Sequence, residues 1–302
     1  MTRTTGPLMA AAAMAGAAWL SLAPAAADDN AERLARLDPE QRAFAEDVQA
    51  FIDSMDAKYF GRASAINGGE QSEETRDFDT EYSLHKVRVA RGPVIAKIGR
   101  MESRGKKASP GRGEGELVWS RFYSIDVHPA TPLVGMLHAT IVVQFYADGS
   151  VGTGGWLDVM PGTRIEEDIA RWGKVVDDHF TAAGKDPALY RELVCKGTEE
   201  TISEFRRKPS CAGVSFYGPP VFRDDPRASY DFISGLYDKF VGTYLDIVED
   251  RQDDPFTAED VAAQDAMRRQ WLIDQLFSDP FASAIVPFEV WSMANVAPVV
   301  KF

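Results

Sequence analysis

The sequence predicts an α+β protein with an antiparallel sheet. Helical patterns, in which apolar residues recur three and four positions apart, lie toward both ends of the chain. Segments rich in β-branched and aromatic residues lie between them. Strands and helices do not alternate one by one, as a parallel sheet with crossover helices requires. The chain has no internal repeat and no convincing linker, so we expect one domain over residues 28–302.

The first helix is predicted to begin after Asp38, with Pro39 in the first helical position. Its apolar residues recur at helical spacing at Phe44, Val48, Phe51, Ile52 and Met55. The stretch 61–81 is polar, and we expect a loop there.

Strand-like segments follow over residues 85–90, 93–99, 117–127, 139–146 and 151–158. A loop rich in Gly, Pro and Lys interrupts them at 106–114. Asp148-Gly149 is a turn signal between the last two segments. These two segments are therefore predicted to form an antiparallel hairpin.

The pattern becomes helical again over residues 165–183, where Glu166, Glu167 and Asp168 suit the positive end of a helix dipole. A short strand is expected at 214–217. A long amphipathic helix over 230–250 carries its apolar stripe at Phe232, Leu236, Phe240 and Tyr244.

The first 27 residues have the pattern of a secretory signal peptide. Arg3 precedes an apolar stretch over residues 8–20, and Ala-x-Ala sites follow at 23–25 and 25–27. The stretch is short for a membrane span, although an uncleaved anchor is the alternative. We expect an exported protein, periplasmic or secreted, with no transmembrane segment after cleavage.

Composition excludes some classes of protein. The net charge of −13 and the pI near 4.8 argue against a nucleic-acid partner. A hydrophobic fraction of 45% argues against disorder. The two cysteines, Cys195 and Cys211, form either a disulfide or two buried thiols, and both alternatives stay open.

Several segments, in the same order along the chain, resemble the oxygen-dependent coproporphyrinogen III oxidase family. Ser124, His128-Pro129, Pro132 and His138-Ala139 stand in register with a family motif of the form Ser-x-x-x-His-Pro-x-x-Pro followed by His-Ala. Further similarity is found at residues 92–99, 154–161, 166–172, 244–249 and 298–302. The resemblance extends from about residue 45 to the C-terminus.

The resemblance implies a flat, largely antiparallel seven-stranded sheet covered by helices on both faces, in a homodimer. It also implies oxidative decarboxylation of a porphyrinogen, a tetrapyrrole, with O2 as co-substrate and no cofactor. The implied catalytic residues are His138 and Asp279, and the implied substrate-binding residues are Ser124, His128, Thr140 and Asp158. No metal site is expected, since two histidines alone do not define one. The alternative for each histidine is a hydrogen-bonded place in the core.

The sequence also departs from the family pattern. Val142 stands where the family has an arginine, residues 285–288 replace a Gly-Gly-Arg segment, and Asp279-Pro280 replaces an Asp-Arg pair. The basic cluster at 206–208 is either a solvated face or a carboxylate site. Three hypotheses follow: an active oxidase, a non-catalytic exported paralogue that binds a tetrapyrrole or another amphipathic carboxylate, and a scaffold without ligand.

We predict cleavage close to Ala27, because the Ala-x-Ala sites follow a short apolar core. N-terminal sequencing of the native protein is expected to begin near residue 28. An intact Met1 or Thr2 would contradict the prediction.

Overall fold

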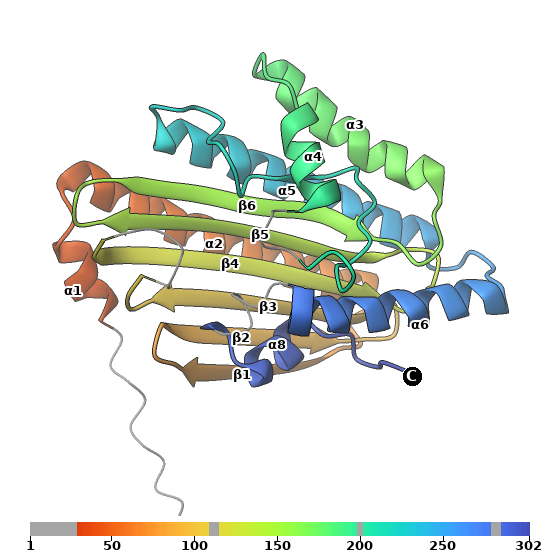
Figure 1. Ribbon diagram of the computed structural model, residues 1–302. Coiled ribbons are helices and arrows are strands. Elements are labelled where there is room, and N and C mark those ends of the chain that lie inside the picture. Colours follow the sequence, from red (N-terminus) through yellow and green to blue (C-terminus); the bar gives the residue numbers. More distant parts are fainter. Residues whose placement is uncertain (1–28, 109–114, 198–201, 279–284) are drawn as a thin grey trace, which may run out of the picture.

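A seven-stranded antiparallel sheet is the centre of the molecule (Figure 1). The computed structural model describes residues 29–108, 115–197, 202–278 and 285–302. The strands are β1 (Ser72–Asp79), β2 (Ser83–Arg91), β3 (Ile95–Gly105), β4 (Leu117–Pro129), β5 (Met136–Tyr146), β6 (Val151–Met160) and β7 (Val214–Ser215). Each pairs with the next in sequence order. The predicted α+β class, the hairpin of β5 with β6 and the seven strands implied by the resemblance are confirmed.

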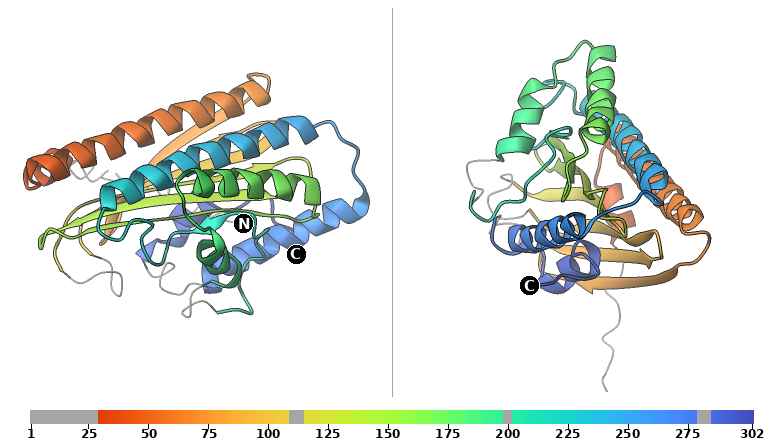
Figure 2. Two further views of the ribbon diagram at one scale, coloured as in Figure 1. Left: turned by 90° about the horizontal axis from the view of Figure 1, so that it is seen from above. Right: turned by 90° about the vertical axis from the view of Figure 1, so that its right-hand side faces the viewer.

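Helices cover both faces of the sheet, as expected (Figure 2). They are α1 (Asn30–Ala35), α2 (Pro39–Ile66), α3 (Glu166–Ala182), α4 (Ala188–Lys196), α5 (Pro226–Arg251), α6 (Ala258–Ile273), the π-helical turn η1 (Asp274–Ser278) and α8 (Phe288–Ala294). Helices α2 and α5 pack on one face, and α3 packs against α5. Helices α6 and α8 lie on the opposite face. None of these described helices is long and apolar enough to cross a membrane.

Alternation along the strands separates a core face from a second face. In β4 the side chains of Trp119, Tyr123 and Ile125 are buried in the main core, against the α2 and α5 side of the sheet. Two tyrosines of α5 hold that helix against the sheet. Tyr237 donates a hydrogen bond to the backbone carbonyl of Ala139, and Tyr244 donates one to that of Gly135. The side chains between these positions therefore point to the opposite face.

The expectation of a loop over 61–81 is wrong. Helix α2 continues to Ile66, and β1 forms the edge of the sheet. Because β1 has one strand neighbour and mostly exposed side chains, it lacks the apolar alternation that marks a half-buried strand. Helices α1, α4, α6 and α8 were not predicted, although the capping box of Thr257 with Asp260 is a readable start for α6.

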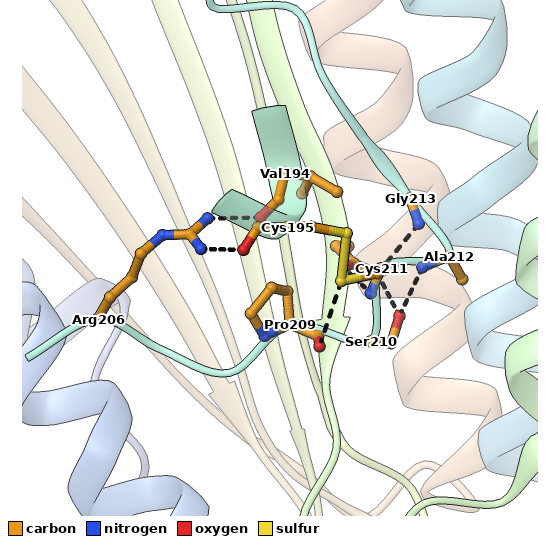
Figure 3. Close-up of a disulfide and its surroundings, with 9 residues drawn as sticks. Val194, Cys195, Arg206, Pro209, Ser210, Cys211, Ala212 and Gly213 are labelled. Atoms are coloured by element: carbon orange, nitrogen blue, oxygen red, sulfur yellow. Dashed lines mark hydrogen bonds between the residues drawn. A yellow bond between two sulfur atoms is a disulfide. The ribbon is translucent and has the colours of Figure 1, made fainter. Parts of the chain in front are cut away.

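A disulfide joins Cys195, at the end of α4, to Cys211, which decides between the two alternatives for these residues (Figure 3). The buried carboxylate of Asp158 in β6 accepts hydrogen bonds from the backbone N–H groups of Cys211 (2.8 Å) and Gly213 (3.2 Å). A Cβ atom on Gly213 would lie 1.7 Å from the carbonyl oxygen of Leu157. The segment that precedes β7 is therefore fixed to both α4 and β6.

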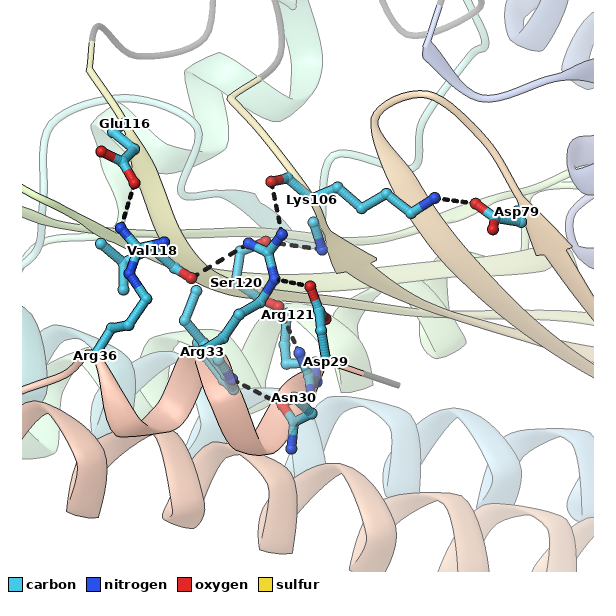
Figure 4. A network of polar contacts seen from close by, with 12 residues as sticks. Asp29, Asn30, Arg33, Arg36, Asp79, Lys106, Glu116, Val118, Ser120 and Arg121 are labelled. Carbon is cyan, nitrogen blue, oxygen red and sulfur yellow. Dashed lines mark hydrogen bonds and ion pairs between the residues drawn. The ribbon is translucent and has the colours of Figure 1, made fainter. Parts of the chain in front are cut away.

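Helix α1 fastens the start of the described chain to the ends of β3 and β4 (Figure 4). The side-chain oxygen of Asn30 accepts hydrogen bonds from Trp119 Nε1 (3.1 Å) and from Arg121. Arg33 donates to the backbone carbonyls of Lys106 (2.9 Å) and Val118 (3.3 Å). The predicted signal peptide lies outside the described residues.

Gly213→Ala is expected to lower the free energy of unfolding by about 1–3 kcal/mol, because the added methyl group must displace backbone atoms of β6. Gly242→Ala is a matched control, since a Cβ at this position of α5 meets nothing within 4 Å. There we expect no loss, or a gain of about 0.5–1 kcal/mol. Urea unfolding measures both variants, and equal effects would contradict the prediction.

Candidate functional site

A cavity of about 530 Å³ lies on the sheet face opposite α2 and α5. Five neighbouring strands supply its floor, with His85 from β2, Ser103 from β3, Phe122 from β4, His138 and Thr140 from β5, and Trp156 from β6. Residues 206–207, η1 and the segment before α8 supply the walls. This volume lies in the range of small-molecule sites.

His138 is held in the floor of the cavity by residues of three elements. Its Nδ1 lies 2.5 Å from Oδ1 of Asp126, which is the residue directly opposite in β4. The rings of Trp156 and Trp271 flank the imidazole, with centroids 5.2 and 5.0 Å from its own. Asp126 is fully buried, whereas His138 is 7% exposed and borders the cavity. The arrangement presents one ring nitrogen to a carboxylate and leaves the other without a hydrogen-bond partner in the described part of the chain.

Two arginines form a basic wall beside His138. The guanidinium of Arg207 lies 4.5 Å from the ring centroid of Trp156 and is ion-paired with buried Asp274 at 2.7 Å. Arg206 donates hydrogen bonds to the backbone carbonyls of Val194 and Cys195 at the end of α4. Burial, and then the charge of Arg207, lower the pKa of Arg206 to about 10. The sequence left open whether this basic cluster is a solvated face or a carboxylate site. Both arginines line the cavity, where a carboxylate could bind.

The site residues implied by the resemblance fall into two groups. His138 and Thr140 line the cavity together, and the hydroxyl group of Thr140 lies 2.9 Å from that of Tyr217. Ser124, His128 and Asp158 do not border it. His128 is buried, with Nε2 3.0 Å from the carbonyl oxygen of Asn295, in agreement with its alternative place in the core.

The functions of these residues stay predictions, and among the described residues only His138 and Thr140 of the six border the cavity. Asp158 has its oxygens engaged by the segment around the disulfide, so we leave it out of the proposal below. Asp279 lies outside the described residues.

Sequence reasoning missed Asp126. The available signal was the alternation of polar residues at 124, 126 and 128 with apolar residues at 125 and 127. Such a run at a spacing of two places all three side chains on one face of the strand. Partners could not be assigned without the register of β4 with β5.

The cavity is apolar where the resemblance expects cations. Val142 of β5 lines it, in the place of one family arginine. Ile285 and Val286, from the segment that replaces Gly-Gly-Arg, line it as well. Carboxylates of a ligand therefore find their nearest cationic wall at Arg206 and Arg207.

A second histidine, His85, also borders the cavity but is poorly suited to proton transfer. Its Nδ1 lies 2.7 Å from the hydroxyl oxygen of Ser103, so the pair has the outline of a nucleophile with its base. Burial, and then the charge of Lys106, lower the pKa of His85 to about 4, which is far from the value that suits a base at neutral pH. Among the described residues no group of three or more His, Cys, Asp or Glu could hold a metal ion.

The fold and the cavity define an α+β protein in which two histidines and two arginines line one candidate small-molecule site. The family model of coproporphyrinogen III oxidase matches residues 40–279, so the chain belongs to this family. It is 26% identical over 137 residues to the oxygen-dependent coproporphyrinogen-III oxidases of Coxiella burnetii strains Dugway 5J108-111 and RSA 331 / Henzerling II. Each match covers 44% of this chain and 43% of the relative, less than half of either protein.

His128→Gln is expected to reduce the loss of stability at acid pH. Burial, followed by the charges of Lys97 and Arg268, lowers the pKa of His128 well below its usual value. Because the folded state binds this proton more weakly than the unfolded state, the contribution is fully present above about pH 6.5 and is lost as the pH falls. One such group removes up to about 1.4 kcal/mol per pH unit.

Urea unfolding at about pH 7 and about pH 5 measures the effect in wild type and variant. Asp158, whose pKa burial raises to about 6, titrates in the opposite sense in both proteins and cancels in the comparison. An equal loss of stability in the two proteins would contradict the prediction.

Proposed function

We propose that this protein binds a porphyrinogen in the cavity and decarboxylates propionate groups oxidatively, with O2 as the electron acceptor. Membership of the coproporphyrinogen III oxidase family supports the reaction class. The observation that carries the proposal is the placement of His138 and Arg207 in one cavity, around the same tryptophan ring.

Arg207 suits the binding of a propionate group. Its guanidinium stacks on Trp156 beside the cavity, and such a planar cation forms strong hydrogen bonds with carboxylates. Arg206 adds positive charge to the same wall. Protein side chains surround much of the cavity, so the attraction between these charges and a carboxylate is stronger than on an open surface.

His138 is the proton-handling group of the proposal. Conversion of a propionate to a vinyl group releases CO2, one proton and two electrons, and O2 takes the electrons. A proton-transfer residue must lie within hydrogen-bonding reach of the reacting atoms. Among the cavity residues that the structure describes, His138 combines a titratable side chain with a ring nitrogen that lacks a hydrogen-bond partner.

A second candidate function is non-catalytic binding of a tetrapyrrole or another amphipathic carboxylate. The apolar side chains of Val142, Ile285 and Val286 favour it. Loss of one charge-assisted hydrogen bond removes roughly 1.5–3 kcal/mol of binding free energy. Two such losses weaken the binding of a tetracarboxylate by at least about two powers of ten. We therefore expect weak turnover of coproporphyrinogen III and a preference for a less charged ligand.

Incubation of the purified protein with coproporphyrinogen III and O2, followed by chromatography of the products, tests the oxidase. An absorbance titration with coproporphyrin tests binding alone. Arg207→Gln is expected to weaken binding in either case, with Lys174→Gln, on the exposed surface of α3, as the control. Efficient turnover with a micromolar KM would contradict the argument from missing arginines, and absence of both binding and turnover would contradict both functions.

Val142→Arg is expected to tighten the binding of coproporphyrin by about tenfold or more, because it restores one cation to the cavity. Val299→Arg adds the same charge at an exposed position of the C-terminal segment and is the matched control. The absorbance titration measures both dissociation constants. Equal affinities in the two variants would argue against a carboxylate near residue 142.

We also propose export and a homodimer. The disulfide between Cys195 and Cys211 supports an oxidising compartment, since reducing compartments keep such thiols free. Family membership supports the dimer, and light scattering on the eluted protein would measure its mass. A monomer at micromolar concentration would contradict the homodimer and would leave the proposal of export unaffected.

A further inference from the structure

Asp126 and His138 form a pair whose geometry defines the tautomer and the orientation of the imidazole ring. The two residues are directly opposite each other in β4 and β5, and both point to the cavity side of the sheet. Oδ1 of Asp126 and Nδ1 of His138 are in direct hydrogen-bonding contact. Asp126 has no exposed surface, so water does not compete for this contact.

The chemistry of the partners decides which nitrogen carries the proton. An ionised carboxylate only accepts hydrogen bonds, so Nδ1 must donate. A neutral imidazole has one N–H group, and Nε2 is then left with a lone pair. The carboxylate therefore selects the Nδ1–H tautomer of His138.

The surroundings also fix the orientation of the ring. Trp156 of β6 and Trp271 of α6 contact the imidazole, so both sheet neighbours of β5 and one helix restrain it. Rotation of the ring by half a turn would exchange Nδ1 with Cδ2, so a carbon atom would face Asp126 and the hydrogen bond would be lost. With Nδ1 so engaged, Nε2 is the ring nitrogen available to a molecule in the cavity.

We propose that Asp126 is a positioning residue that holds His138 as the proton acceptor of the cavity. The inference rests on the proposed function for the identity of the ligand. In the step, the proton that is released when a propionate becomes a vinyl group forms a new N–H bond at Nε2, CO2 leaves, and the two electrons pass to O2. The bond from Nδ1 to Asp126 is kept throughout, and its carboxylate stabilises the imidazolium that results.

The charged groups around the pair are consistent with this direction of transfer. Arg207 packs over Trp156 and Trp271 and is paired with Asp274, so its charge is partly compensated. Lys97 of β3 interacts electrostatically with Asp126 from within the sheet, and His128 with His138. Asp126 alone among these groups bonds to the imidazole.

The tautomer of His138 can be measured without any turnover. In ¹⁵N NMR of the whole protein at neutral pH, we expect the signal of a protonated Nδ1 and an unprotonated Nε2. Asp126→Asn should populate the other tautomer, because an amide both donates and accepts. Asp168→Asn is the matched control, since this aspartate is also buried and ion-paired but bonds to Arg251 on α5.

Activity supplies a second readout. We expect Asp126→Asn to lower kcat about 10- to 100-fold with little change in KM, as for other residues that orient a functional histidine. A proton acceptor loses activity as the pH falls, whereas a proton donor loses it as the pH rises.

Each outcome bears on a separate claim. A protonated Nε2 in the wild type, or a tautomer unchanged in Asp126→Asn, overturns the positioning role. Activity that declines toward high pH overturns the direction of transfer. The Nδ1–H tautomer in a protein without turnover supports the role of Asp126 and contradicts the oxidase.

Discussion

The packing of α2 and α5 on one face of the sheet is the constraint from which the site follows. Side chains of a strand alternate between the two faces of the sheet. When one residue points into the core, the residues before and after it therefore point to the opposite face. In β4 and β5 the core face is filled by aromatic and β-branched side chains, including Tyr123, Ile141 and Val143. Polar side chains of these strands thereby lie together on the opposite face, which carries α6 and α8 and lines the cavity.

Two of the charged groups at the cavity are each matched by a polar partner, because a buried charge without one is costly. The carboxylate of Asp126 has His138, and the guanidinium of Arg207 has Asp274. Asp158 serves a different purpose, since it accepts hydrogen bonds from the segment that carries both arginines toward the cavity. The disulfide anchors that same segment to α4. A covalent bond, a buried acid and an ion pair thus hold the basic wall in place.

The sequence predicted the fold class and most central elements because their signals are local. The apolar stripes of α2 and α5 and the turn at Asp148-Gly149 are each readable within one segment. The polar edge strand β1 and the short helices α1, α4 and α8 were missed because their structure depends on neighbours that local patterns do not reveal, whereas α6 had a readable capping box. For the site, the motif indicated His138 and Thr140, and the structure places both at the cavity. Asp126 required the register of two strands, and the position of Arg207 required the path of a segment tied by a disulfide.

The attachment of α1 has a consequence for the order in which the protein assembles. Asn30 meets Trp119 and Arg121, partners 89 and 91 positions further along the chain. During synthesis this helix emerges well before the strand that receives it, and a six-residue helix is marginal in isolation. Contacts of such high sequence separation form only after the intervening chain has been ordered. The first helix of the described chain therefore reaches its native contacts only once β3 and β4, which supply them, are in place.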